Sequence, residues 1–234
     1  MHTAGRALLL VLAAAAIAPL HAAGPDIPET ASRDIDFVPK GWKLYDKAEG
    51  DLNGDGTTDS VLVIQENDPN KVIDNPDGFG VDHYAANQRI LLFVLSDADY
   101  SFRLAGRDDL VIPDRNSPTI DDPYSGLAIK DGKATLFLRF WASAGSWYMS
   151  SHQFHFRWEG KAMQVIGYDG LEVHRASGVL KEVSVNYLTG RRKDVIGSIS
   201  DDSEQEGTWS KVAPGSRPKV GSIGNGFDFL PFPP

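Results

Sequence analysis

The stretch Asp51-Leu-Asn-Gly-Asp-Gly-Thr-Thr-Asp59 and the apolar run Val61-Leu-Val-Ile64 that follows it decide the local fold of this 234-residue chain. Five oxygen donors occupy alternate positions of the stretch: the side chains of Asp51, Asn53, Asp55 and Asp59, and the backbone carbonyl of Thr57. Gly54 and Gly56 permit the positive φ angles that a sharp loop needs. Calcium binds about six to eight hard oxygen ligands, and a loop of this spacing supplies several of them from one turn. We therefore predict a Ca²⁺ site in this loop.

The loop departs from an EF-hand in two ways. An EF-hand has a bidentate Glu at position 12, where this chain has Leu62, and here a strand follows in place of a helix. An ordinary Asn-Gly or Asp-Gly turn with surface acids is the alternative, but four oxygen side chains in register favour a metal site, and without a cation the three carboxylates would repel one another. Nothing near the loop supplies an acid, base or nucleophile for metal chemistry, so we expect calcium to have a structural role.

Outward from the loop, apolar residues recur with a period of two. Short runs rich in β-branched and aromatic residues predict strands, and the clearest lie within 61–64, 90–95, 100–104, 134–140, 154–158 and 183–187. Turn dipeptides separate several of them: Asp131-Gly132, Glu159-Gly160, Asp169-Gly170 and Thr189-Gly190. No window of about 12 residues in the mature chain has clean helical spacing. The pattern predicts an all-β, antiparallel single domain, a β-propeller-like meander with one calcium loop.

The calcium-loop motif does not recur along the chain. A complete propeller would repeat its unit every few tens of residues. The chain is therefore either a single-domain relative of propeller blades or an incomplete propeller.

Several segments do not fit the strand pattern. We expect residues 24–40 to form an extended N-terminal arm, followed by the all-β calcium-binding domain at 41–215. The Pro/Phe-rich tail at 216–234 either packs back on the domain as a strap or hangs loose. Residues 66–88 and 108–125 are rich in Asn, Asp, Pro and Gly. Loops longer than about 12–15 residues are more often functional or disordered than idle.

Residues 1–23 predict a cleaved secretory signal peptide. Arg6 precedes the apolar run Leu8–Leu20, and small residues follow at Ala22 and Ala23. A membrane anchor is the alternative, but this run, broken by Pro19, is shorter than the roughly 20 residues that a span needs. We expect a protein exported to the periplasm that is not inserted in the membrane after cleavage.

Composition limits the partners. The chain has no cysteine, which excludes disulfides and thiolate chemistry. Its formal net charge of −9 becomes −10 once Arg6 is removed with the signal peptide. This acidity argues against nucleic acid and anionic membranes and favours a cationic partner, such as the often basic hydrolases of the cell wall.

Catalytic motifs are poorly represented. There is no Gly-x-Ser-x-Gly, His-Glu-x-x-His or phosphate-binding glycine loop. His152 and His155 are three apart on a predicted strand and so point to opposite faces, which suits structural histidines better than a metal site. The acid pairs Asp108-Asp109 and Asp121-Asp122 fit solvated turns better than a glycosidase site. The sequence does not predict an enzyme.

The segment Ser143-Ala-Gly-Ser-Trp-Tyr148 lies between two predicted strands. Its small residues let the backbone enter a cleft, whereas Trp147 and Tyr148 supply rigid anchors of the kind found at binding hot spots. Alternatively, both aromatics begin the next strand and pack in the core, or strand alternation places one inside and one outside. The residues leave these alternatives open. The candidate partner-binding residues are Ser143, Gly145, Ser146, Trp147 and Tyr148.

A combination of segments across about residues 40 to 200 resembles a family of bacterial periplasmic calcium-binding proteins related to FG-GAP/VCBS-type β-propellers. The segments are Gly50–Asp59, Val61–Ile64, Gly145-Ser-Trp147, Phe156-Arg-Trp158, an expected turn at Ile166-Gly-Tyr-Asp169, and Asn186-Tyr-Leu-Thr-Gly190. The resemblance extends to immunity proteins of xanthomonads, which inhibit a peptidoglycan hydrolase delivered by a type IV secretion system. Periplasmic lysozyme inhibitors push a loop with Ser, Gly and Tyr into the hydrolase cleft, and Ser143–Tyr148 resembles that loop without strictly matching its motif.

The resemblance implies a periplasmic protein that binds and inhibits a peptidoglycan hydrolase or another basic envelope protein. The alternative is a calcium-stabilised structural or protein-interaction module of the envelope without inhibitory activity. An enzyme that acts on glycans is a third, weaker hypothesis.

Overall fold

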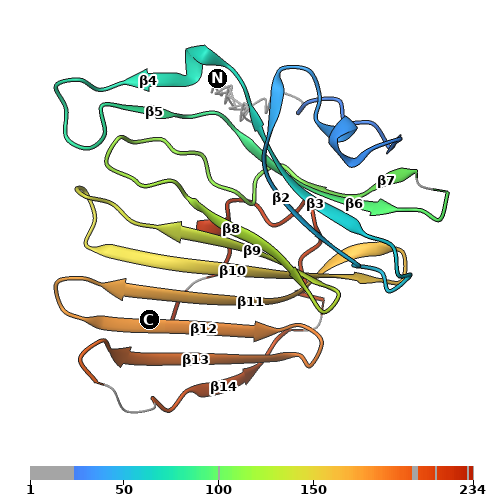
Figure 1. Cartoon of the computed structure of the whole chain (residues 1–234). Helices are drawn as coiled ribbons and strands as arrows, with labels where there is room; N and C mark the ends of the chain where they lie inside the picture. Colours follow the sequence, from blue (N-terminus) through green and yellow to red (C-terminus); the bar gives the residue numbers. More distant parts are fainter. Residues whose placement is uncertain (1–23, 100, 202–204, 214, 231, 234) are drawn as a thin grey trace, which may run out of the picture.

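A computed structural model describes residues 24–99, 101–201, 205–213, 215–230 and 232–233 (Figure 1). The described chain is all-β and antiparallel, as the sequence predicts. The expected signal peptide at 1–23 lies outside the described residues. Helices within the described part are single 3₁₀ turns: η1 (Asp34–Phe37), η2 (Pro69–Lys71) and η3 (Gly226–Asp228). None of the described helices has the length and apolar character that crossing a membrane would require.

The strands form two large sheets and one ribbon. In the seven-stranded sheet each strand pairs with the next along the chain: β8 (Tyr124–Lys130), β9 (Lys133–Phe140), β10 (Tyr148–Glu159), β11 (Ala162–His174), β12 (Val179–Asn186), β13 (Arg191–Ser198) and β14 (Thr208–Lys211). The five-stranded sheet has the order β1 (Thr30–Ala31), β7 (Phe102–Asp108), β6 (Arg89–Ser96), β3 (Asp59–Glu66) and β2 (Trp42–Gly50). The ribbon pairs β4 (Val72–Asp74) with β5 (His83–Ala85). A meander of consecutive strands is consistent with the expected likeness to propeller blades.

The central strands of the five-stranded sheet, β3 and β6, are buried on both faces, which explains their unbroken apolar runs. Every residue of β6 is buried. In β3, Val61 and Val63 pack in the core shared with the seven-stranded sheet, whereas Leu62 and Ile64 pack in a second cluster on the other face. A strand with two buried faces has no solvent-exposed side for polar residues, so its sequence is a continuous apolar run.

The seven-stranded sheet instead follows the predicted alternation. In β10, His152, Phe154 and Phe156 are buried while the residues between them are only half-buried. The rings of Phe156 and Phe93 lie 5.0 Å apart and join the two sheets across the shared core. Burying one such side chain contributes about 1.5–3 kcal/mol to folding.

The turn predictions have mixed outcomes. Asp131 and Gly132 form the two-residue link between β8 and β9, with φ angles of 52° and 69°, as expected of a hairpin turn that needs positive φ. The turn predicted at Asp169-Gly170, and with it the turn at 166–169, is wrong because these residues lie inside β11. A Cβ on Gly170 would lie 2.7 Å from the Tyr168 hydroxyl, so this glycine serves close packing within a strand.

The two terminal segments cover the sheets. In the N-terminal arm, β1 pairs with β7, and the buried Ile27 and Phe37 pack in the second cluster of the five-stranded sheet. The tail packs back as a strap, with Phe229 in ring contact with Phe154 and Tyr168 at 5.0 Å each. The loose alternative for the described part of the tail is therefore wrong.

The edges of β2 and β8 adjoin at the junction of the two sheets. Arg89, buried in β6, forms a bidentate ion pair with Asp122, just before β8. The Tyr45 hydroxyl in β2 donates to the same carboxylate at 2.9 Å. This network links the five-stranded sheet to the segment that leads into the seven-stranded one.

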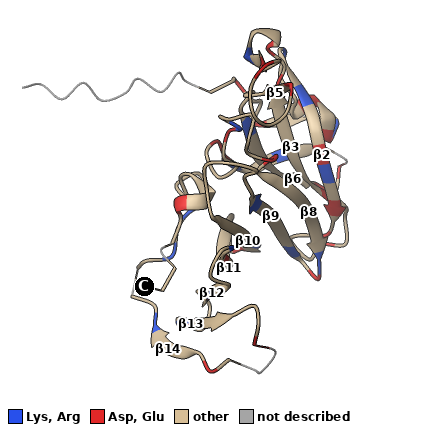
Figure 2. Ribbon diagram, turned by 90° about the vertical axis from the view of Figure 1, so that its left-hand side faces the viewer, with Lys and Arg blue, Asp and Glu red and all other residues tan. Residues whose placement is uncertain are grey.

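Antiparallel pairing sends the loops to two opposite ends of the molecule (Figure 1). The loop 51–58 between β2 and β3 lies at one end with the β6–β7 and β8–β9 turns. The β4–β5 ribbon, the segment 108–123 and the β9–β10 loop lie at the other end, which faces the viewer in Figure 2. The two candidate sites identified in the sequence therefore lie far apart.

Candidate functional site

The calcium loop has the sharp backbone that the sequence predicts. Gly54 and Gly56 have φ angles of 80° and 84°. The Asp51 carboxylate accepts the N–H groups of both glycines, at 2.7 Å and 2.9 Å. The Asp55 carboxylate accepts the N–H of Thr57 at 2.8 Å and also its hydroxyl proton. These contacts hold the loop closed on its exposed side.

Asp59 occupies a different environment from the other acids of the loop. It begins β3 and is fully buried. Its two carboxylate oxygens accept the backbone N–H groups of Leu52 at 2.7 Å and Ser96 at 2.9 Å. Burial raises the pKa of Asp59, the two N–H donors oppose that shift, and the charges of Asp55 and Asp51 add to it. A nearby cation would offset this accumulation of negative charge.

The chemistry of the donor set fits Ca²⁺. The three carboxylates, the Asn53 amide oxygen and the Thr57 carbonyl are hard oxygen donors. Each carboxylate oxygen that accepts one N–H keeps further lone-pair capacity. Within the described residues, however, no three acidic or histidine side chains already form a group arranged to hold a metal ion. The calcium site stays a prediction that rests on ligand type and loop conformation.

The second candidate site is the loop between β9 and β10. Tyr148 is the first residue of β10, yet neither aromatic enters the core, because Trp147 is 65% exposed and Tyr148 is 47% exposed. Gly145 has a φ of 88°, which lets the tip turn tightly. The Ser146 hydroxyl oxygen accepts the Tyr148 N–H at 3.0 Å. The structure thus presents both aromatics at the surface, against the alternative that they pack inside.

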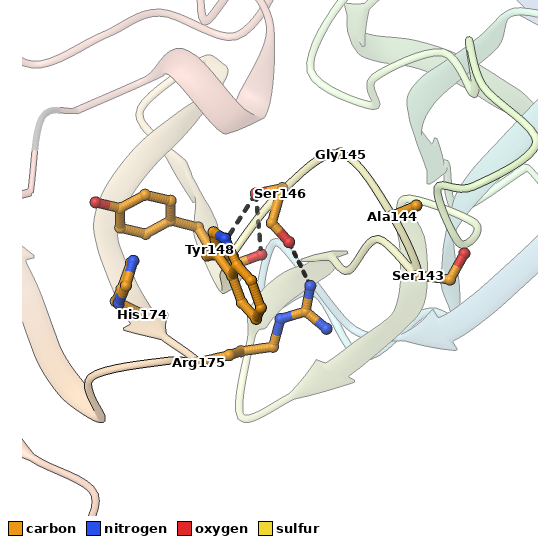
Figure 3. A pocket seen from close by; sticks show the side chains of 8 residues that line it. Ser143, Ala144, Gly145, Ser146, Tyr148, His174 and Arg175 are labelled. Atoms are coloured by element: carbon orange, nitrogen blue, oxygen red, sulfur yellow. Dashed lines mark hydrogen bonds between the residues drawn. The ribbon is translucent and has the colours of Figure 1, made fainter.

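Arg175, in the turn after β11, braces this loop. Its guanidinium donates to the carbonyl of Ala142 at 2.9 Å. It also donates to the carbonyl of Ser146 (Figure 3). Its backbone N–H donates to the Trp147 carbonyl at 2.8 Å. The guanidinium carbon also lies 5.3 Å from the Trp141 ring centroid. A planar guanidinium has enough donors to hold several carbonyls at once, so one side chain fixes both ends of the tip.

Tyr148 also contacts the turn after β11. Its ring meets His174 edge-on, with centroids 4.8 Å apart (Figure 3). The loop 143–148, His174 and Arg175 line an open hollow of about 510 Å³. The site therefore combines an aromatic edge, small residues and a cation in one concave surface.

His174 and Arg175 were not identified from the sequence. They are 26 or more residues from the loop in the sequence, and the pairing of β10 with β11, which sets Tyr148 opposite His174, brings them to it. No motif or short-range spacing signals such a contact.

The remaining polar candidates make structural contacts. Asp108 is buried and accepts the N–H groups of Leu110, Val111 and Gly221, and burial raises its pKa against these donors. The other three acids of the two pairs each form an ion pair: Asp109 with Arg107, Asp121 with Arg139 and Asp122 with Arg89. The two acids of each pair thus contact different groups and do not act together.

The two histidines of β10 point to opposite faces, as predicted. His152 is buried in the core and contacts the Tyr168 hydroxyl at 2.7 Å. His155 lies on the other face between the Thr135 hydroxyl at 3.0 Å and the Asp169 carboxylate at 2.8 Å. This hydroxyl–histidine–carboxylate chain has the order of a nucleophile and its base. Thr135 is only 7% exposed, which keeps its hydroxyl from a substrate.

No protein-family model matches the sequence, and comparison with curated proteins and with solved structures gives no significant match.

Proposed function

We propose that this protein is a periplasmic calcium-binding protein that binds and inhibits a peptidoglycan hydrolase through the loop 143–148. The observation that carries the proposal is the exposure of Trp147 and Tyr148 on a loop braced by Arg175. A large aromatic side chain on a fixed loop loses little conformational entropy when it enters a partner's cleft. The family resemblance suggests that the partner with this cleft is a cell-wall hydrolase.

The loop suits insertion into a polysaccharide-binding cleft. Its tip has no side chain larger than serine from Ser143 to Ser146, so the backbone can approach the cleft floor. The acidic net charge, −9 for the full chain and −10 without Arg6, complements a basic hydrolase and favours rapid association with it.

Calcium has a structural role in this proposal. Asp51, Asn53, Asp55, Asp59 and Thr57 would hold Ca²⁺, whose charge would relieve the repulsion among the three carboxylates. The loop joins β2 to β3 at the end of the molecule opposite the β9–β10 loop (Figure 1). Calcium would thus stabilise the fold without contacting the hydrolase.

Lysis assays test the proposed function. The purified protein is mixed with lysozyme-type hydrolases, including any encoded beside its gene, while peptidoglycan turbidity is followed. We expect inhibition by the wild type, and loss of at least tenfold in potency for Trp147→Ala and Tyr148→Ala. Trp209→Ala is the matched control, since Trp209 is 55% exposed on β14, far along the seven-stranded sheet. Failure of the wild type to inhibit any hydrolase, or equal loss in the control, contradicts the proposal.

The second candidate is a calcium-stabilised interaction module without inhibitory activity. The contacts of Asp59 favour it, because this buried carboxylate already links the calcium loop to β6. It predicts a large calcium-dependent rise in melting temperature together with no effect on any hydrolase.

A further inference from the structure

Exposed apolar side chains gather on the β4–β5 ribbon and the turn at its tip. Phe79 at its tip is 86% exposed, and Val72, Ile73 and Val81 are each at least 40% exposed. Single exposed apolar residues are normal on a protein surface. Four of them on one ribbon, with a phenylalanine at the tip, are typical of a contact surface.

The ribbon is tied to the loop 143–148 through the segment 117–120. The Val81 N–H donates to the Pro118 carbonyl at 3.0 Å, and the Ser143 N–H donates to the Thr119 carbonyl at 2.8 Å. A Cβ on Gly80, whose φ is 102°, would lie only 2.2 Å from the Pro118 carbonyl oxygen, so the ribbon tip and this segment are in close contact. The tip of the β4–β5 ribbon and the β9–β10 loop therefore lie at the same end of the molecule, which faces the viewer in Figure 2.

The acidic charge of the ribbon favours a basic partner. Residues 72–88 contain Asp74, Asp77 and Asp82 and no lysine or arginine. All three carboxylates are exposed, and none forms an ion pair within the described part of the chain. An acidic rim repels an anionic membrane and a second copy of this acidic chain, and it attracts a basic protein surface.

We infer that the β4–β5 ribbon is a second contact for a basic protein partner, with Phe79 as its apolar anchor and Asp74, Asp77 and Asp82 as its charged rim. This inference rests on the proposed function, because it extends the surface that the loop 143–148 begins. The two contacts would then act differently. Rim charges raise the association rate, whereas a buried aromatic anchor slows dissociation.

Binding kinetics on an immobilised basic lysozyme, and on any hydrolase that the wild type inhibits, test this inference. We expect Asp74→Asn/Asp77→Asn/Asp82→Asn to lower the association rate by about tenfold at low salt, with the difference lost near 1 M salt where screening is strong. Phe79→Ala is expected to raise the dissociation rate by about tenfold. The control Asp131→Asn/Glu182→Gln/Glu206→Gln makes the same charge change at exposed positions outside the ribbon.

The outcomes separate this inference from the proposed function. Equal association rates for the two triple variants overturn the ribbon contact, whether or not the wild type inhibits a hydrolase. Binding that depends on the ribbon but gives no inhibition supports the contact and contradicts the inhibitor proposal. No binding of the wild type to any basic hydrolase overturns both.

Discussion

The carboxylate of Asp59, the first residue of β3, accepts the backbone N–H of Ser96, the last residue of β6, at 2.9 Å. Its other oxygen accepts the N–H of Leu52, within the calcium loop, at 2.7 Å. One buried side chain thus connects the loop to the ends of two paired strands. Because these contacts join three separate parts of the backbone, Asp59 contributes to the fold in addition to any role as a metal ligand.

Replacement of Asp59 should destabilise the protein even in the presence of a chelator. Asp59→Ala leaves two buried N–H donors without an acceptor, at about 1–3 kcal/mol each, so we expect a loss of about 2–6 kcal/mol by urea denaturation in EDTA. Asp55→Ala is the control, because Asp55 is exposed and its contacts are local to the loop. Equal stability of the two variants in EDTA would show that the buried contact does not matter.

Calcium should raise the melting temperature of the wild type. A ligand present at about 100 times its Kd adds about 2.7 kcal/mol, which corresponds to roughly 5–10 °C for a domain of this size. Calorimetric titration should show at least tenfold weaker calcium binding by Asp55→Ala, and unchanged affinity would contradict the ligand assignment. Because Trp147 lies at the opposite end, EDTA should leave the binding of a hydrolase at 25 °C unchanged as long as the protein stays folded.

The period-two pattern was sufficient to predict an all-β fold, and the apolar runs at Val61–Ile64 and Ile90–Leu95 located its two central strands. Local signals of this kind depend only on neighbouring residues. The Asp131-Gly132 turn was predicted for the same reason, since both residues accept positive φ. The turn predicted at Asp169-Gly170 is wrong because an Asp-Gly dipeptide also occurs where a strand needs a glycine for close packing, here against Tyr168.

Long-range contacts account for what the sequence did not reveal. Arg175 reaches the loop 143–148 because β10 pairs with β11. The β4–β5 ribbon is connected to that loop through Pro118 and Thr119. No spacing in the sequence encodes such contacts. The sequence also did not decide whether Trp147 is buried or exposed, since strand alternation alone allows its side chain to point to the core or to solvent.

Arg175 should matter for the order of the loop more than for the stability of the fold. Arg175→Ala removes the donors to the Ala142 and Ser146 carbonyls, so we expect faster hydrogen exchange across 143–147 and a loss of about 1–2 kcal/mol in unfolding free energy. Binding of a hydrolase should weaken because the loop must then be ordered on association. Arg175→Lys keeps the charge but lacks the planar fork, so it should restore little of the protection. Full restoration by lysine would mean that charge alone holds the loop.

His152 should make the fold sensitive to mild acid. Burial lowers its pKa to about 4 from an ordinary value of 6.5, so the unfolded chain takes up a proton that the folded chain excludes. Stability contributed by the neutral histidine is therefore complete above pH 6.5 and is lost as the pH falls towards 4, by about 3 kcal/mol in total. Urea denaturation between pH 7 and 5 should show about 2 kcal/mol of this fall in the wild type and in the exposed-site control His83→Gln. His152→Gln should be less stable at pH 7, because it disturbs the contact with Tyr168, but should show a much flatter profile. An equally steep profile in His152→Gln would assign the acid sensitivity to other groups.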